Sequence, residues 1–395
     1  MNSSYRFATL AVHAGESPCA MTGALDTPIY QSTTFAFESA DEMAAIFGEE
    51  KFGYMYTRYG NPTIRALESK MASLEGGEAA LATASGMAAI SSAILGYVKA
   101  GDHVVAARSL YGASYDFLNR KLPRYGASAT FVPSACVEDF ERCIRPNTRL
   151  IYFETPSNPV LEIIDMQALA DVARARKIPL MMDNTFGTPV LQQPLASGVT
   201  VVVHSATKYL CGHGDAMGGI IVGPKPYIAE LSREIVRDFG GVISPFNAWL
   251  ILRGIHTLHL RMATQCASAM RIAEFLSAHP RVERVNYPGL PGHPGHELAR
   301  KQMQAFGAMI SFEVQGGYEG GKRVMDRVKI FARAASLGDT RSLIVHSAST
   351  SHRAVPREQR VAIGVTDGLV RLSIGVEAVE DLIDDLDQAL TYSGD

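Results

Sequence analysis

The segment VTVVVHSATKYLCGHGD (residues 199–215) joins an apolar run to a cluster of polar side chains. The run predicts a buried strand, and Ser205, Thr207 and Lys208 stand at its end. Lysine is almost never fully buried without a partner, because an unpaired ammonium in a low-dielectric site shifts its pKa or is not tolerated. Lys208 therefore either reaches out to water or has its nitrogen held in a covalent bond.

Further short apolar runs lie on both sides of this segment, separated by helical stretches such as DMQALADVARARKI (165–178). Continuous apolar strands that alternate with helices predict an α/β fold with a mostly parallel central sheet, covered on both faces. The other predicted strands are AALATAS (79–85), HVVAAR (103–108), SATFVP (128–133), LIYFET (150–155), PLMMDN (179–184) and GGIIVG (218–223).

The sequence pattern changes after about residue 255, where long amphipathic stretches appear. AVEDLIDDLDQAL (378–390) places Val379, Leu382, Ile383, Leu386 and Leu390 on one face, which predicts a closing helix. The expected organisation is an N-terminal arm (1–60), a large cofactor-binding domain (61–259) and a smaller α/β C-terminal domain (260–395).

The composition of the chain narrows the classes of partner. Its 395 residues carry a net charge of −3, which disfavours nucleic acid or an anionic membrane as a partner. Five scattered cysteines without a C-x-x-C pair, and an N-terminus without an apolar core, favour a cytoplasmic protein. Residues 79–98 are uncharged and long enough to cross a membrane, but ATASG divides them, so we expect a strand, a turn and a helix there.

Polar residues occur at the ends of three predicted strands, where open α/β sheets bind their ligands. Gly86, in ATASGMAAI, permits close backbone approach, and the following helix offers free N–H groups to an anion. Asp183 follows four apolar residues in PLMMDN, and Lys208 follows VTVVVHS. Taken singly, Gly86 suits tight packing, Asp183 suits a turn cap, and Lys208 suits a solvent-directed side chain. Together they indicate one crevice.

Pyridoxal 5′-phosphate uses all three features of this crevice. Its aldehyde condenses with a lysine amine, its ring nitrogen must stay protonated, and its phosphate is a dianion. A carboxylate beside the ring nitrogen favours the protonated form, while helix N–H groups and hydroxyls suit the phosphate. The sequence therefore predicts that Lys208 binds this cofactor covalently, with Asp183 at the ring nitrogen.

Several motifs resemble the Cys/Met-metabolism branch of fold-type I pyridoxal-phosphate enzymes, which have an aspartate-aminotransferase-like fold. The resemblance runs from about Thr9 to Leu390 in the same order. The motifs are YTRYGNPT (56–63), SLEGGEAALATASGMAAI (73–90), SLYGASYDF (109–117), ETPSNP (154–159), SATKYLCGHGD (205–215) and GLVRLSIGVE (368–377).

The resemblance implies a role for each matched residue. Lys208 would hold the cofactor and then act as acid and base, and Asp183 would pair with the ring nitrogen. Tyr111 would stack on the ring and handle a proton near the leaving group. The residues implied at the phosphate are Gly86, Met87, Ser205 and Thr207.

Two further sets of residues concern neighbouring subunits and the substrate. In the family, Tyr56 and Arg58 reach the phosphate of a neighbouring subunit, which implies a homo-oligomer, usually a tetramer built as a dimer of dimers. Arg371 would bind the carboxylate of an amino-acid substrate through two parallel hydrogen bonds, helped by Asn158 and Ser336.

The implied reaction is γ-elimination or γ-replacement on a sulfur- or homoserine-derived amino acid. Release of 2-oxobutanoate is the methionine γ-lyase outcome. Addition of a thiol at Cγ is the outcome of an O-succinyl- or O-acetylhomoserine sulfhydrylase or a cystathionine γ-synthase. Methionine γ-lyases typically carry a cysteine where this chain has Ala113, which keeps open an oxygen-linked substrate such as canavanine. STSH (349–352) is closer to the sulfhydrylases, and HRAVPREQR (352–360) stays unassigned near the expected substrate mouth.

Two other classes are disfavoured. A cofactor-binding regulator without catalysis would have lost the lysine, the aspartate or the arginine, and all three are present. HPGHE (293–297) offers two histidines, but the Pro-Gly between them indicates an exposed turn, so no metal site is predicted.

Overall fold

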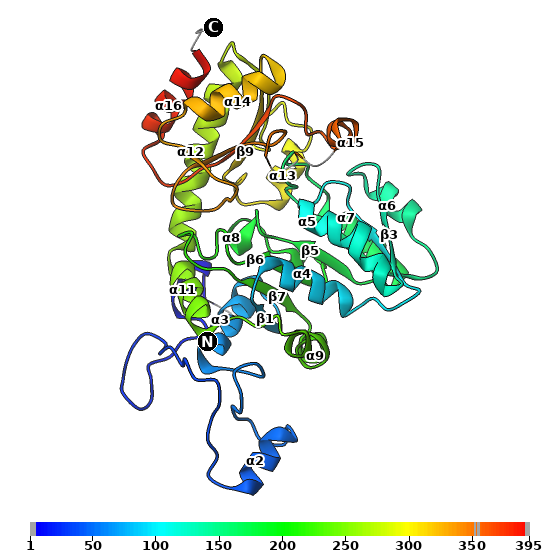
Figure 1. The fold of residues 1–395 in the computed structure, drawn as a ribbon, viewed down its shortest axis with the longest axis vertical. Coiled ribbons are helices and arrows are strands. Elements are labelled where there is room, and N and C mark those ends of the chain that lie inside the picture. Colours follow the sequence, from blue (N-terminus) through cyan, green and yellow to red (C-terminus); the bar gives the residue numbers. More distant parts are fainter. Residues whose placement is uncertain (1–4, 351–352, 354–355, 392–395) are drawn as a thin grey trace.

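The computed structural model of the protein describes residues 5–350, 353 and 356–391. The segments 349–352 and 352–360 singled out in the sequence therefore lie partly outside the described residues. Two sheets organise the chain, joined by the long helix α12 (Leu258–Ala278) (Figure 1).

The larger sheet contains all seven strands predicted from apolar runs. β6, β5, β4, β2 and β3 are parallel, whereas β7 is antiparallel to both of its neighbours, so the prediction of a mostly parallel sheet is confirmed. The spatial order is β1 (Ala79–Thr83), β7 (Gly219–Gly223), β6 (Val201–Ser205), β5 (Leu180–Asp183), β4 (Thr148–Glu154), β2 (His103–Ala106) and β3 (Ser128–Phe131).

Helices cover both faces of this sheet. On β7, Ile220 and Val222 pack in the same apolar cluster as Leu67 of α3, whereas Ile221 packs in the cluster that contains Ile90 of α4. The alternation of side chains along a strand produces this division. The helical segments of this part are α3 (Pro62–Glu75), α4 (Gly86–Leu95), α5 (Gly112–Asp116), α6 (Val137–Cys143), α7 (Met166–Arg176), α8 (Thr188–Leu191), α9 (Lys225–Leu231), α10 (Arg237–Phe239) and α11 (Pro245–His256), with short η turns at Phe117–Lys121, Leu122–Tyr125, Pro194–Ser197 and Ser232–Val236.

The smaller sheet follows α12 and is mainly antiparallel. Its order is β10 (Ala332–Arg333), β11 (Leu343–His346), β12 (Leu369–Ser373), β9 (Met309–Val314) and β8 (Val282–Asn286). The other helices of this part are α13 (His296–Gln302), α14 (Gly317–Arg327), α15 (Arg357–Ala362) and α16 (Val379–Thr391). The closing helix has the predicted apolar face, since Leu382, Leu386 and Leu390 are buried. The expected boundary at 259/260 falls in the first turn of α12.

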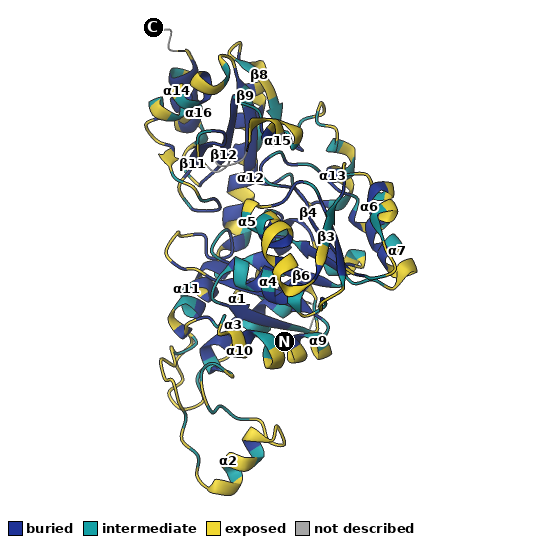
Figure 2. Cartoon of the chain, turned by 45° about the vertical axis from the view of Figure 1, so that its right-hand side comes forward, coloured by how far each residue is buried: buried dark blue, intermediate teal, exposed yellow. Residues whose placement is uncertain are grey.

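The N-terminal segment is anchored at its root and exposed further along. Helix α1 (Phe7–His13) packs on α3, whereas α2 (Ala40–Phe47) projects away from the two sheets (Figure 1). Figure 2 shows exposed residues along much of this projecting segment.

Residues 79–98 form β1 and then α4, as the sequence predicted in place of a membrane span. Among the described residues, no helix has the length and apolar character that crossing a bilayer requires.

Candidate active site

Lys208 lies three residues beyond β6, and its side chain points toward Ser336, between β10 and β11 of the smaller sheet. Its Nζ donates to the Ser336 hydroxyl at 2.8 Å. Burial lowers the pKa of the Lys208 ammonium, and the nearby charge of Arg371 lowers it further. A lowered pKa makes the neutral amine more available, and the neutral amine is the form that attacks an aldehyde.

Arg371 lies in β12, between β11 and β9, and is 8% exposed. Its Nη1 donates to Asn158 Oδ1 at 2.9 Å and its Nη2 to the Ser336 carbonyl at 3.1 Å. Within the described part of the chain no carboxylate pairs with Arg371, and its Nε is buried without a partner. Burial lowers its pKa to about 10, which still leaves a cation at neutral pH. The structure thus brings Asn158, Ser336 and Arg371 together beside Lys208, with donor capacity left for a carboxylate.

Asp183 ends β5, one strand away from β6. Its Oδ1 accepts from the Thr185 N–H at 2.9 Å and from the Thr185 hydroxyl at 2.5 Å. The same hydroxyl accepts from the Ser205 N–H at 2.8 Å, so Thr185 ties the carboxylate to the end of β6. Burial raises the pKa of Asp183, while Thr185 and the charge of His204 act in the opposite direction. The sequence analysis missed Thr185, although its position two residues after a strand-end aspartate is typical of a supporting turn.

Glu154 is a second carboxyl in the crevice that the sequence analysis did not single out. It ends β4 in register with Asp183, is 5% exposed, and accepts from the Tyr111 N–H at 2.9 and 3.1 Å. Burial and the charge of Asp183 raise the pKa of Glu154 well above its ordinary value. Because Thr185 and His204 stabilise the charge on Asp183, Asp183 is the carboxyl that ionises first, and Glu154 keeps its proton.

Tyr111 stands immediately before α5 and is 47% exposed, so its ring is open to a ligand. Its backbone is fixed by Glu154, whereas no hydrogen bond of its hydroxyl is present among the described residues. Tyr111 is therefore not part of the hydrophobic core.

The N-terminus of α4 lies against Ser205 and forms a cradle for an anion. A Cβ at Gly86 would lie 2.7 Å from Ser205 Cβ, so only glycine permits this approach. Ser85 caps the helix by accepting from the Ala88 N–H, which leaves the N–H groups of Gly86 and Met87 at the helix start. An anion is favoured at this position.

Thr207 adds a hydroxyl near this cradle, in mutual contact with Gly218. It donates to the Gly218 carbonyl at 3.2 Å and accepts from the Gly218 N–H at 3.1 Å. A hollow of about 210 Å³ adjoins it, lined by Thr207, Gly214, Asp215, Ala216, Met217, Ser336, Leu337 and Asp339.

Tyr56 and Arg58 are not brought to this crevice within one chain. Arg58 Nη1 donates to the Arg237 carbonyl at 2.9 Å, and its guanidinium lies 5.0 Å from the Tyr59 ring centroid. Tyr56 is 38% exposed and pairs with Thr34 in the arm. The contacts that the structure gives these two side chains are with the arm and the 237–238 segment.

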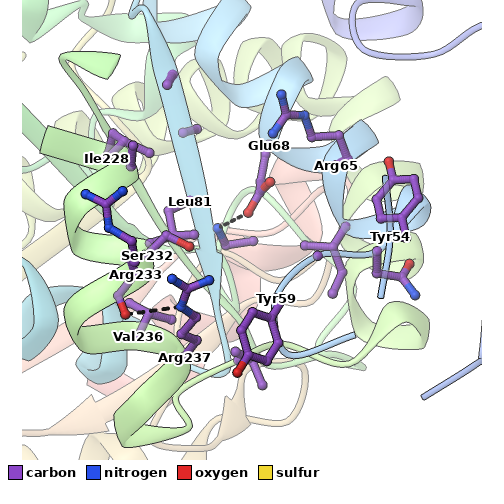
Figure 3. A pocket seen from close by; sticks show the side chains of 18 of the residues that line it. Tyr54, Tyr59, Arg65, Glu68, Leu81, Ile228, Ser232, Arg233, Val236 and Arg237 are labelled. Atoms are coloured by element: carbon purple, nitrogen blue, oxygen red, sulfur yellow. Dashed lines mark hydrogen bonds between the residues drawn. The ribbon is translucent and has the colours of Figure 1, made fainter. Parts of the chain in front are cut away.

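A cavity of about 600 Å³ lies beneath the arm, away from Lys208 (Figure 3). It opens between the arm, α3 and α9, against the edge strand β1. In Figure 3 the Glu68 carboxylate accepts a hydrogen bond from the backbone of β1, the Ala82 N–H at 3.0 Å, with Arg65 beside it. Burial raises the pKa of Glu68 to about 7.

The fold and the crevice define a class: an α/β protein that presents an amine, a carboxylate and an anion cradle at the ends of neighbouring strands. Pyridoxal phosphate fits this donor set, because the Gly86 cradle, the Asp183 carboxyl and the Lys208 amine match its three functional groups.

The chain belongs to the Cys/Met metabolism PLP-dependent enzyme family, which matches residues 8–391. It is therefore a pyridoxal-phosphate-dependent enzyme that acts on a small molecule. It is 50% identical to an L-methionine gamma-lyase of Porphyromonas gingivalis over 97% of this chain and 96% of that protein. It is 42% identical to an O-succinylhomoserine sulfhydrylase of Pseudomonas aeruginosa, covering 97% and 95%.

A solved structure supports both the fold and the cofactor. The O-acetylhomoserine (thiol)-lyase of Campylobacter jejuni superposes with a TM-score of 0.95 at 33% identity, covering 98% of this chain and 100% of that one. It carries a pyridoxyl-lysine phosphate.

Proposed function

We propose that the protein removes the substituent on Cγ of methionine or a related amino acid, as a γ-lyase. The observation that carries this proposal is the pairing of two groups in one crevice. A lysine of lowered pKa lies beside an arginine that is buried, held by Asn158 and, among the residues that the structure describes, not paired with a carboxylate. Such a pair suits a substrate with an α-carboxylate. The 50% identity to an L-methionine gamma-lyase supports methionine as the first substrate to test.

The residues divide into those that hold the cofactor and those that handle the substrate. When bound, pyridoxal phosphate supplies an aldehyde and an electron-withdrawing ring that stabilises negative charge at Cα. Lys208 holds the cofactor covalently, and Asp183 accepts a hydrogen bond from its ring nitrogen. The phosphate is held by Gly86, Met87, Ser205 and Thr207.

Proton transfer falls to Lys208 and Tyr111. The Lys208 amine would become free when the amine of the substrate takes its place on the cofactor. It would then take the proton from substrate Cα and return it to another carbon of the substrate, which its lowered pKa favours near neutral pH. Tyr111 stacks against the ring and offers its exposed hydroxyl to the leaving group. Arg371 and Asn158 fix the substrate carboxylate, while Ser336 holds both the amine and the guanidinium in place.

Ala113 supports a second candidate function, γ-replacement or cleavage of an oxygen-linked substituent. It lies in α5, two residues after Tyr111, where methionine γ-lyases typically carry a cysteine. Without that thiol, a homoserine ester with sulfide, or canavanine, is a competing substrate. The 42% identity to an O-succinylhomoserine sulfhydrylase supports the first of these.

The arm bears on assembly. We infer that Tyr56 and Arg58 contact the cofactor phosphate of a neighbouring subunit, since their contacts among the described residues are with the arm and residues 237–238. We propose that the assembly is a tetramer built as a dimer of dimers, located in the cytoplasm. Each chain would consist of the arm (1–60), the large domain (61–259) and the C-terminal domain (260–395).

A substrate panel tests the proposed function. Methionine, homocysteine, O-acetyl- and O-succinylhomoserine, cystathionine and canavanine are each supplied with and without sulfide. We expect 2-oxobutanoate from methionine without sulfide. Homocysteine formed only from an ester plus sulfide would replace the lyase by the sulfhydrylase, and cleavage confined to Cβ would exclude both. The variant A113C should raise methionine cleavage relative to the other substrates.

A further inference from the structure

A network of buried polar side chains lies behind Asp183. Asp183 pairs with Val203 across the sheet, so the next residue, His204, points to the opposite face. There His204 Nε2 lies 2.6 Å from Oε1 of Glu75, the last residue of α3. Both side chains are 1% exposed.

The network also holds the residue that follows Asp183. Asn184 Nδ2 donates to the same Glu75 oxygen at 2.9 Å, and the Asn184 N–H donates to the Val203 carbonyl at 2.9 Å. Glu75 thus joins the end of β5 to the end of β6, directly behind the Asp183 carboxylate.

From Asn184 the network continues toward the substrate side. Gln192 Nε2 donates to Asn184 Oδ1 at 2.8 Å and to the Thr155 carbonyl at 2.6 Å. Thr155 follows Glu154, and three residues further Asn158 holds Arg371. The strand ends that carry the two crevice carboxyls are therefore fixed by a single set of side chains.

Packing alone does not account for this arrangement. A buried ionisable pair contributes little to stability compared with apolar side chains of similar volume. In addition, Glu75 Oε2 and His204 Nδ1 are buried without a hydrogen-bond partner among the described residues. The arrangement does act on Asp183, because the charge of His204 lowers the pKa of that carboxyl against the effect of burial.

We propose that His204, held by Glu75, is a positioning residue for Asp183, which it keeps ionised and aligned toward the ring nitrogen of pyridoxal phosphate. The proposal rests on the assignment of Asp183 to that nitrogen. Its consequence is that the protonation of the bound cofactor depends on a histidine on the far face of the sheet.

The experiment follows the cofactor's ring nitrogen by NMR in holoenzyme loaded with ¹⁵N-labelled pyridoxal phosphate. The chemical shift reports the protonated fraction between pH 6 and 9. In His204→Gln we expect the midpoint of this titration to fall by about one pH unit, a tenfold change, and the dissociation constant of the cofactor to rise. Glu75→Gln, which keeps the side-chain volume, should shift the midpoint in the same direction by less.

His103→Gln is the matched control. His103 is also a fully buried histidine of the larger sheet, bonded to Thr148 at 2.9 Å and to Thr130 at 2.8 Å, but it lies on β2. It should lose stability without moving the nitrogen titration. On its own face of the sheet, Asp183 has the titratable groups Glu154 and Tyr152 from β4, whereas His204 acts through its charge from the opposite face. The nitrogen titration is therefore also measured in Glu154→Gln.

The outcomes separate this inference from the proposed function. If His204→Gln destabilises the protein as His103→Gln does and leaves the midpoint unchanged, His204 is only structural and the inference fails. If His204→Gln does not fold, Glu75→Gln decides by the same criterion. Asp183→Asn should abolish protonation of the ring nitrogen in the same pH range. A ring nitrogen that stays protonated in Asp183→Asn would instead overturn the cofactor assignment itself.

Discussion

The crevice and the N-terminal arm both carry residues assigned to the cofactor, and they differ in how the chain supports them. In the crevice, Asp183 and Arg371 are held by Thr185, Asn158 and neighbouring backbone. In the arm, aromatic side chains stay open to solvent, with Phe52 71% exposed. Exposed aromatic and arginine side chains are characteristic of protein interfaces. The comparison indicates that one chain builds the amine and carboxylate sites from its own residues, whereas the exposed side chains of the arm suit the proposed contact with another copy.

The largest expected effect lies in the crevice. Lys208→Ala should lower the release of 2-oxobutanoate by about 10³-fold or more, because covalent holding and proton transfer are lost together. Borohydride reduction of the wild type should fix the cofactor to Lys208, as peptide mass spectrometry can detect. The exposed Lys322→Ala is the control and should be unchanged. Label on any other lysine would contradict the assignment.

Mixing variants tests whether the arm serves a neighbouring crevice. Chains with Lys208→Ala and chains with Arg58→Ala are unfolded and refolded together. In a two-fold dimer, half of the particles are mixed, and each mixed particle holds one intact site of two. About a quarter of wild-type activity should therefore return. If native mass spectrometry confirms mixed particles but no activity returns, Arg58 acts within its own chain.

The root of the arm should control stability. Lys70 is fully buried and its Nζ is bonded to Glu16 at 2.8 Å and to the Ala11 carbonyl at 2.6 Å, while His256 lies 2.6 Å from the same Glu16 oxygen. Glu16→Gln should lower the free energy of unfolding by about 3 kcal/mol, because it leaves a buried cation uncompensated. Glu42→Gln, which removes an exposed ion pair with Lys51, should lower the free energy of unfolding much less than Glu16→Gln does.

The same anchor has a defined pH dependence. Burial raises the pKa of Glu16, but the hydrogen bonds and charges of His256 and Lys70 outweigh it and lower the value from 4.5 to about 2. The anchor therefore contributes fully above pH 4.5, and its contribution is lost as the pH falls toward 2. The difference in melting temperature between wild type and Glu16→Gln should shrink over that range. A difference that is constant with pH would show that Glu16 acts uncharged.

A smaller effect is expected at the substrate arginine. Arg371→Lys keeps the charge but loses the planar pair of donors, so KM should rise about 30-fold, or about 2 kcal/mol, with a smaller change in kcat. Steady-state kinetics with the best substrate of the panel measure the changes in KM and kcat separately. Arg284→Lys, on the surface of β8, should change neither parameter. A loss confined to kcat would mean that Arg371 does not bind the ground-state carboxylate.

The strands and the strand-end residues could be predicted from sequence because each is a local pattern. PLMMDN and VTVVVHS are apolar runs with polar ends, and the sheet then brings Asp183 and Lys208 to one edge. Glu154, Thr185 and His204 were missed for a different reason. His204 is part of an apolar run, and its partner Glu75 lies 129 positions away, so only the folded sheet shows that they meet. The role of Tyr56 and Arg58 at a neighbouring subunit was predicted by resemblance alone, since no periodicity in the sequence marks a contact with another copy.

The smallest expected effect is in the cavity beneath the arm, at Glu68. Its folded-state pKa of about 7 exceeds the ordinary 4.5 because burial disfavours its charge. The native protein therefore loses stability as the pH rises from 4.5 to 7.

Glu68→Gln keeps an acceptor for the Ala82 N–H and removes the charge. It should stabilise the protein by about 1 kcal/mol at pH 8, a value reduced for solvent screening, and by much less at pH 5. Glu78→Gln, on the same cavity wall, is the control in thermal unfolding at the two pH values. Equal stabilisation at pH 5 and pH 8 would show that the effect of Glu68→Gln does not come from the charge of the buried carboxylate.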